Sequence, residues 1–126
     1  MILERAKYER EKKTTFETFN DGVCNIYKLA DISLPGFKPV FKPKFYRAVP
    51  FHYKTIGVKR NYEAMQNQVR IDELISIMQN RNISTQDIVV IEGVQYDIKQ
   101  VQHKNDTSPR TSLVTLQRLE EDYDDI

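Results

Sequence analysis

The chain has 126 residues, a mass of 14.9 kDa and a formal net charge of +1 at pH 7. This length fits one domain with one core, and the single cysteine, Cys24, excludes a disulfide framework and a thiolate cluster for zinc or iron–sulfur chemistry. No stretch approaches the roughly 20 apolar residues of a membrane span, and residues 1–13 lack the apolar core of a signal peptide. We therefore expect a soluble protein that is cytoplasmic where it is made, with no membrane partner.

Charge is unevenly spread along the chain. Residues 1–13 form a highly charged N-terminal arm, whereas Ser33 to Tyr62 contains seven Lys or Arg and no Asp or Glu. Residues 120–126 are an acidic C-terminal tail with too few apolar groups to pack. These features predict flexible termini around one domain, residues 14–119.

The N-terminal part of that domain reads as a hairpin followed by a long loop. Thr14 to Phe19 and Val23 to Leu29 are strand-like and flank an Asp-Gly pair, which is typical of a tight hairpin turn. Four of the five prolines then fall between Ser33 and Pro50. Because proline lacks an amide donor and restricts φ, we expect a long Pro-rich loop over residues 33–44 instead of a central strand.

The middle of the chain mixes strand and helix signals. Phe45 to Arg60 alternates as a strand, and Pro50 indicates an edge position or a bulge. One face of this predicted strand consists of Phe45, Arg47, Val49, Phe51, Tyr53 and Thr55. Asn61 to Gln68 predicts a turn or two of helix, and the β-branched Val69 to Met78 predicts another strand.

The C-terminal part predicts a three-stranded meander. Its strands are Ile88 to Ile91, Val94 to Gln102 and Thr111 to Leu119, with a bulge near Lys99 and Gln100 where the alternation slips. The chain as a whole predicts a mainly β fold, a small antiparallel barrel or sandwich of about six or seven strands with one short helix.

The sequence lacks recognisable catalytic, metal-binding or phosphate-binding motifs. His52 and His103 are 51 positions apart, neither has a second metal-type residue at i+2 or i+4, and no Gly-rich phosphate loop is present. Asp106-Thr107-Ser108 lacks the glycine of an aspartic protease triplet and favours a turn. Cys24 lies in an apolar strand, where a thiol is usually buried and inert. We predict no catalytic residue, no metal and no cofactor, and hence a protein that is not an enzyme.

One segment is a candidate site, because basic and aromatic residues are interleaved in the Pro-rich loop and just after it. Its residues are Phe37, Lys38, Phe41, Lys42, Lys44 and Arg47. Lys and Arg can neutralise phosphates, while aromatic rings can stack on bases or anchor the segment in apolar pockets. A protein-contacting loop, a non-specific DNA contact and a plain solvated loop all remain open.

Several motifs resemble those of head-tail connector proteins of siphophages and related prophages. They are TFETFNDGVCNIY (Thr15 to Tyr27), TIGVKRNYEA (Thr55 to Ala64) and ISTQDIVVI (Ile83 to Ile91), followed by segments similar to the closing strands of that family around Gln95 to Gln102 and Asp106 to Leu116. The similarity covers about Thr15 to Glu120, and the shared motifs are structural, not catalytic. This sequence differs from the shorter members of the family by its Pro-rich loop.

The resemblance implies a head closure, or stopper, protein. Such a protein is a structural component of the virion neck, a small β-barrel that forms a homo-oligomeric ring, of twelve-fold symmetry in the family, below the portal and its adaptor. The ring retains packaged double-stranded DNA, which it can contact in the channel, and presents the surface for the tail-completion protein. A tail-completion or adaptor subunit of the same connector is an alternative, and a small β-barrel nucleic-acid-binding protein is an alternative from another class.

Overall fold

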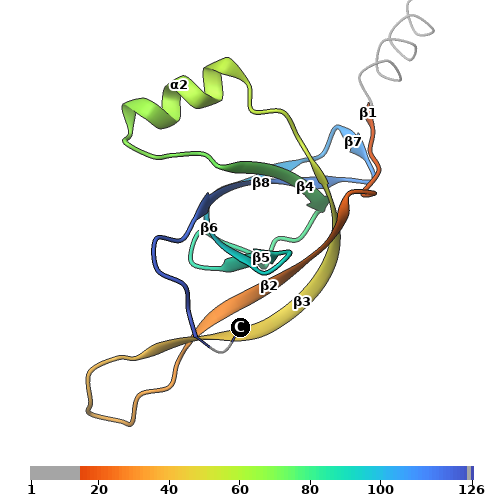
Figure 1. Cartoon of the computed structure of the whole chain (residues 1–126). Helices are drawn as coiled ribbons and strands as arrows, with labels where there is room; N and C mark the ends of the chain where they lie inside the picture. The colour runs from red at the N-terminus through yellow and green to blue at the C-terminus, as the bar shows by residue number, and fades with distance from the viewer. Residues whose placement is uncertain (1–14, 125) are drawn as a thin grey trace, which may run out of the picture.

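The computed structural model describes residues 15–124 and 126, and within them six antiparallel strands close into a barrel in the order β2-β3-β4-β8-β6-β5 (Figure 1). The barrel strands are β2 (Gly22–Asp31), β3 (Phe41–Tyr53), β4 (Glu73–Met78), β5 (Ile88–Ile91), β6 (Val94–Lys104) and β8 (Thr111–Arg118). Helix α2 (Val58–Gln66) links β3 to β4, and the short strands β1 (Thr15–Phe16) and β7 (Thr107–Ser108) pair in parallel as a separate sheet. The predicted mainly β barrel with a short helix is confirmed. The predicted N-terminal arm, residues 1–13, lies outside the described residues.

The inside of the barrel is filled by every second residue of its strands, as the period of a strand requires. The buried cluster comprises Cys24, Ile26, Phe51, Ile75, Ile77, Ile83, Val89, Ile91, Ile98, Val114 and Leu116. Burying each large aliphatic or aromatic side chain stabilises the fold by about 1.5–3 kcal/mol. This core holds the strands and leaves the longer β2–β3 pair free to extend past it.

The prediction of a first hairpin around Asp21 and Gly22 is wrong. Gly22 begins β2, which pairs with β3, and β1 pairs with β7. Asp21 instead closes the end of the β2–β3 ladder, because its carboxylate accepts the Tyr53 amide at 2.8 Å and its own amide donates to the Phe51 carbonyl at 3.1 Å. The Asp-Gly pair therefore marks a strand start, a role that its local sequence does not distinguish from a turn.

The long loop is shorter than the predicted residues 33–44, because β3 already begins at Phe41 and includes Pro43. The Ile32 amide donates to the Val40 carbonyl at 2.8 Å. Along an antiparallel ladder, residue pairs that exchange backbone hydrogen bonds alternate with pairs that do not. The Leu29–Pro43 pair therefore falls at a non-bonded position, where the missing proline amide removes no ladder bond. The sequence correctly places proline at a strand edge but underestimates how far that strand runs.

The predicted single face of β3 is also wrong in its first half. A bulge opposite Ile26 and Tyr27 shifts the register of the β2–β3 pair. Val49 and Phe51 do share a face, which lies against the barrel core, but before the bulge Tyr46 packs against the core and Phe45 is 54% exposed. The bulge therefore leaves Phe41 and Phe45 of early β3 on the outer face, while Tyr46 stays against the core.

The later elements follow the sequence closely. β5, β6 and β8 form the predicted meander, and the β6–β8 register shifts between Ile98 and Gln100 as predicted. The helix begins before the predicted Asn61, and β4 occupies only the second half of Val69 to Met78. The tail packs more than expected, because the Gln95 side chain donates to the Tyr123 carbonyl at 2.9 Å and accepts its amide at 2.8 Å.

Candidate functional site

A two-stranded hairpin projects from the barrel and carries the candidate residues named from the sequence. β2 pairs with β5 only up to Tyr27, and β3 pairs with β4 only from Phe51 onward. Residues 28–44, here called the projecting hairpin, therefore stand clear of the barrel (Figure 1, lower left). Two paired strands alone are only marginally stable in water. This element must therefore be stabilised by its own turn, by contacts at its base or by a partner.

The tip of the projecting hairpin is held by Asp31. Its carboxylate accepts the amide of Ser33 at 2.9 Å and the amide of Val40 at 3.2 Å. These hydrogen bonds, chiefly the one from Ser33, lower the pKa of Asp31. A charged Asp31 thus closes the loop, residues 32–40, that displays Phe37 and Lys38.

The two faces of the projecting hairpin differ in chemistry, because residues paired across a ladder share a face. One face continues the barrel interior and is basic, with Lys28 opposite Lys44 and Ala30 opposite Lys42. The other face continues the barrel exterior and is mostly apolar, with Asp31 as its one charged residue in the hairpin. We call that face, together with the outer residues of the β2–β3 pair, the outer strip; it consists of Val23, Tyr27, Leu29, Phe41, Pro43, Phe45, Ala48 and Pro50.

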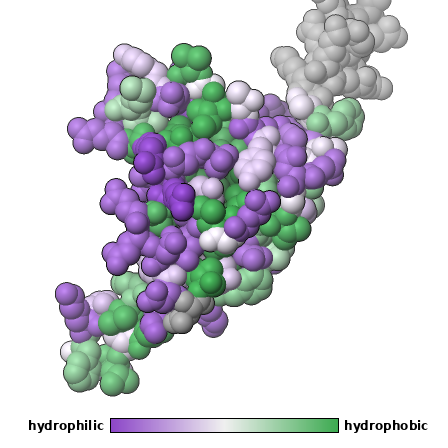
Figure 2. All heavy atoms as spheres, viewed as in Figure 1, coloured by the Kyte–Doolittle hydropathy of each residue, from purple (hydrophilic) through white to green (hydrophobic). Residues whose placement is uncertain are grey.

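The structure therefore separates the residues that the sequence grouped. Phe41 is on the outer strip, Lys42 and Lys44 are on the opposite face, and Phe37 and Lys38 are in the tip. Figure 2 shows hydrophobic residues gathered at the end of the hairpin, where Leu34 and Phe37 are 69% and 71% exposed. Sequence analysis missed the apolar partners on β2, although alternation through the last residues of that strand carries the signal.

The base of the hairpin is fixed by charged and aromatic contacts. The Lys28 ammonium lies 2.9 Å from an Asp87 carboxylate oxygen and also bonds the Asn82 carbonyl. The same ammonium lies 4.9 Å from the centre of the Tyr46 ring, and the Arg47 guanidinium lies 5.2 Å from it. Arg47 is thus placed beside the hairpin base instead of near the tip.

The free edge of β3 is poorly suited to adding a strand from another molecule. Between Phe41 and Pro50 no second neighbour is paired to β3 in the described structure. Pro43 and Pro50 lack amide donors, and lysines alternate with the apolar residues, which are common protections of an edge strand. Contacts through the faces of the hairpin are therefore favoured over contacts through this edge.

Helix α2 is the second unusual surface, because none of its residues is buried. The Arg60 guanidinium ties it to the barrel by donating to Gln100 at 3.1 Å, Thr115 at 3.0 Å and Gln102 at 2.8 Å. The opposite side of the helix presents Val58, Tyr62 and Met65, which are 88%, 61% and 69% exposed. Their spacing of i, i+4 and i+7 makes one apolar stripe.

Hollows lie on both sides of Arg60, between the helix and the barrel. The larger, about 790 Å³, reaches the outer faces of β4, β6 and β8, and the smaller is about 260 Å³. The buried Ser76 hydroxyl lines the larger hollow and has no hydrogen-bond partner in the described part of the chain. Lys54 there is already paired with Glu17 at 2.7 Å. The helix is therefore held to the barrel mainly by the hydrogen bonds of Arg60, with little packed surface between them.

The residues considered for chemistry are engaged in structural contacts. His103 Nδ1 lies 2.8 Å from the Ser112 hydroxyl, and His52 Nδ1 lies 2.7 Å from an Asp21 oxygen. Cys24 is fully buried, and burial raises the pKa of its thiol to about 12. Within residues 15–124 no group of three or more His, Cys, Asp or Glu side chains gathers in a metal-binding arrangement. The described helix is too short and polar to cross a membrane.

Comparison with known proteins adds no relative, since no protein-family description and no curated protein matches this sequence.

Proposed function

We propose that this chain is a head closure subunit of a tailed-phage neck, which forms a ring below the portal and adaptor, retains packaged DNA and presents the surface for tail attachment. The proposal starts from the motif resemblance over Thr15 to Glu120. The structural observation that carries it is the projecting hairpin, a ribbon with a basic face and an apolar face that extends beyond a compact barrel.

The two faces suit the two kinds of contact that a neck subunit makes. The face with Lys42 and Lys44 offers positive charge to DNA phosphates without hydrogen-bonding groups that would read a base sequence, while Lys28 at its base is paired with Asp87. The apolar face offers Phe41 and Phe45, each more than half exposed, to protein. A ribbon of this kind can line a channel on one side and contact protein on the other.

The direct experiment is electron microscopy of particles made by a phage that lacks this gene, combined with nuclease protection of their DNA. The proposal predicts tailless heads whose DNA becomes accessible to nuclease. Complementation with the wild-type chain restores tailed, protected particles. Normal tailed particles would refute the connector role. Heads that retain their DNA beside separate tails would assign the chain to the tail side of the connector.

A nucleic-acid-binding β-barrel is the second candidate, favoured by the same lysine face. It predicts that the purified chain binds double-stranded DNA with log affinity falling linearly against log salt, with a slope of about −0.9 for each phosphate neutralised. Loss of that binding in Lys42→Glu with Lys44→Glu would locate it on the hairpin. Absence of binding by the wild-type chain at low salt would exclude this candidate.

A further inference from the structure

The barrel carries two exposed apolar surfaces that face in opposite directions. The outer strip covers the outside of β2 and β3, and the helix stripe consists of Val58, Tyr62 and Met65. In Figure 1 helix α2 lies at the upper left and the β2–β3 pair forms the lower right wall, with the barrel between them. One surface is a sheet face and the other a helix face, a pairing that commonly forms two packed layers in proteins.

Helix α2 lacks the support that a short helix needs. Nine residues are too few for a stable isolated helix in water, and the helix has no side-chain N-cap, no buried residue and a hollow on either side of Arg60. Covering Val58, Tyr62 and Met65 would bury the largest apolar groups that the helix possesses. The helix therefore has little packing support from its own chain, and a second surface placed on its apolar stripe would stabilise it.

From these features we infer that a second copy of this chain covers the helix stripe, with the outer strip of one copy packed on helix α2 of the next. The contact is heterologous, since two different surfaces meet. A growing assembly has a free outer strip at one end and a free helix stripe at the other. Copies can therefore continue to add, and the assembly closes into a ring when the rotation between neighbours brings these two ends together. This inference rests on the proposed function, because it names the surfaces through which the proposed ring is built.

The size of the surfaces fits a ring better than an isolated pair. Aromatic side chains bury about 150–250 Å² each when fully covered. Phe41 and Phe45 are 55% and 54% exposed, so these two rings supply roughly 200 Å² of contact. A stable pair of proteins buries about 800 Å² on each partner. A single contact is therefore weak, whereas ring closure gives every copy two contacts.

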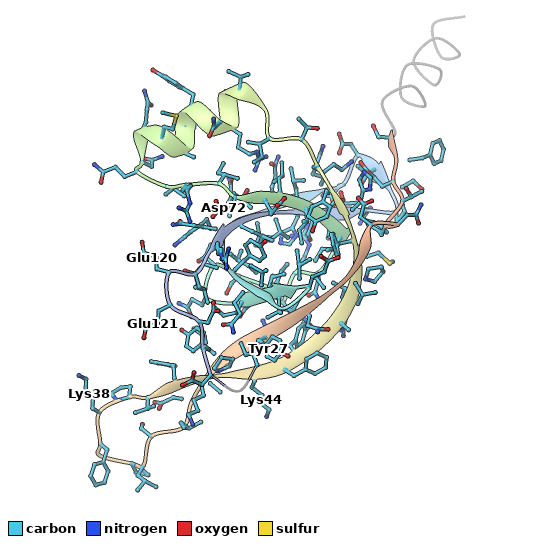
Figure 3. All side chains as sticks on the ribbon, viewed as in Figure 1. Tyr27, Lys38, Lys44, Asp72, Glu120 and Glu121 are labelled. Atoms are coloured by element: carbon cyan, nitrogen blue, oxygen red, sulfur yellow. The ribbon has the colours of Figure 1, made fainter. Side chains whose placement is uncertain are left out.

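Charge is arranged to favour the same orientation. Asp72, Glu120 and Glu121 lie along one side of the barrel between helix α2 and the hairpin, and Lys38 and Lys44 lie on the hairpin itself (Figure 3). The exposed Lys59 stands beside the helix stripe, and Asp31 shares the outer face of the hairpin. Such an asymmetric field orients two approaching copies head to tail before the apolar surfaces meet.

The test uses the purified full chain and two variants, one for each surface. Phe45→Asp disables the outer strip and Tyr62→Asp disables the helix stripe, while Phe16→Asp changes an equally apolar exposed residue that belongs to neither surface. Sedimentation velocity up to about 1 mM protein should show association of the wild-type chain and of Phe16→Asp, and association about tenfold weaker or more for each of the other variants.

Mixing the two disabled variants gives the decisive result. Phe45→Asp keeps its helix stripe and Tyr62→Asp keeps its outer strip, so a one-to-one mixture should form dimers and nothing larger. A mixture that stays monomeric, a wild-type chain that is monomeric at every concentration, or variants that associate like the wild type would overturn the inference. Leaking heads in the gene-lacking phage would still support the proposed function in that case, so the two failures are distinguishable.

Discussion

At the scale of single residues, Cys24 shows how burial decides chemistry. The thiol has no exposed surface inside the barrel, and burial raises its pKa to about 12. Since the thiolate is the reactive form, the native chain at pH 8 should react with a thiol reagent at least about a hundredfold more slowly than the unfolded chain. An absorbance assay with an aromatic disulfide measures both rates. Comparable rates would mean that β2 opens readily from the barrel.

Arg60 is the residue that holds helix α2 to the barrel, since its guanidinium makes three hydrogen bonds to the outer face of β6 and β8. In Arg60→Ala the amides of the helix should exchange with solvent about tenfold faster or more, while the amides of β4 and β8 stay protected. Lys59→Ala, at the exposed neighbouring position, is the matched control. Hydrogen exchange followed by mass spectrometry gives the comparison, and equal helix protection in both variants would contradict this anchoring role.

At the scale of elements, the turn between β5 and β6 depends on an unusual backbone. Glu92 and Gly93 have φ angles of 50° and 80°, and they join the paired residues Ile91 and Val94. A Cβ on Gly93 meets no atom within 4 Å, so only the backbone conformation disfavours a side chain there. Gly93→Ala should reduce the free energy of unfolding by about 1–2 kcal/mol. Urea denaturation measures this loss, and an unchanged midpoint would show that the turn relaxes without cost.

The loop at the tip of the projecting hairpin should respond to acid through Asp31. The amides of Ser33 and Val40 favour its ionised form, so the pKa of Asp31 in the folded chain lies below the ordinary value of 3.8. This contribution to tip order is complete above that value and is lost as the pH falls through the lowered pKa. The amide proton shifts of Ser33 and Val40 should titrate with a midpoint below 3.8, and Asp31→Asn should abolish the titration. A midpoint above 3.8 would contradict the hydrogen bonds.

Local pattern was sufficient for some elements and insufficient for others. The β5–β6–β8 meander and the bulge beside Lys99 follow from alternation and short turns, which depend only on nearby residues. The role of Asp21 and Gly22 depends on Phe51 and Tyr53, some 30 positions away, so a local turn signal gave the wrong hairpin. The bulge in β2–β3 likewise depends on the partner strand, which is why the separation of aromatic from basic residues was not predicted.

At the scale of the whole molecule, the barrel acts as a rigid base for surfaces that are left uncovered. The core is confined to one closed layer of strands, while the outer strip, the basic hairpin face and the helix stripe all lie outside it. Substitutions on these surfaces should therefore change assembly with little effect on folding. The candidate residues could be located from composition, but their division between two faces required the register of the β2–β3 pair.

Reversal of charge on the hairpin separates its function from the stability of the barrel. Lys38, Lys42 and Lys44 are exposed and belong to no ion pair within the described residues, so their joint replacement by Glu should shift the thermal midpoint little while impairing DNA retention or neck assembly. Circular dichroism and thermal unfolding check the fold. Replacement of Arg81, Arg110 and Arg118 by Glu is the control with the same change of net charge, because these residues are also exposed and belong to no ion pair among the described residues.

The most direct test of the account is nuclease protection of DNA in phage heads that lack the native gene and are supplied with one of these two triple variants. We predict that heads carrying the Lys38, Lys42 and Lys44 replacements lose their DNA to nuclease, whereas heads carrying the control replacements keep it and gain tails. Protected DNA and wild-type infectivity with the hairpin variant would contradict the claim that this hairpin works at the neck.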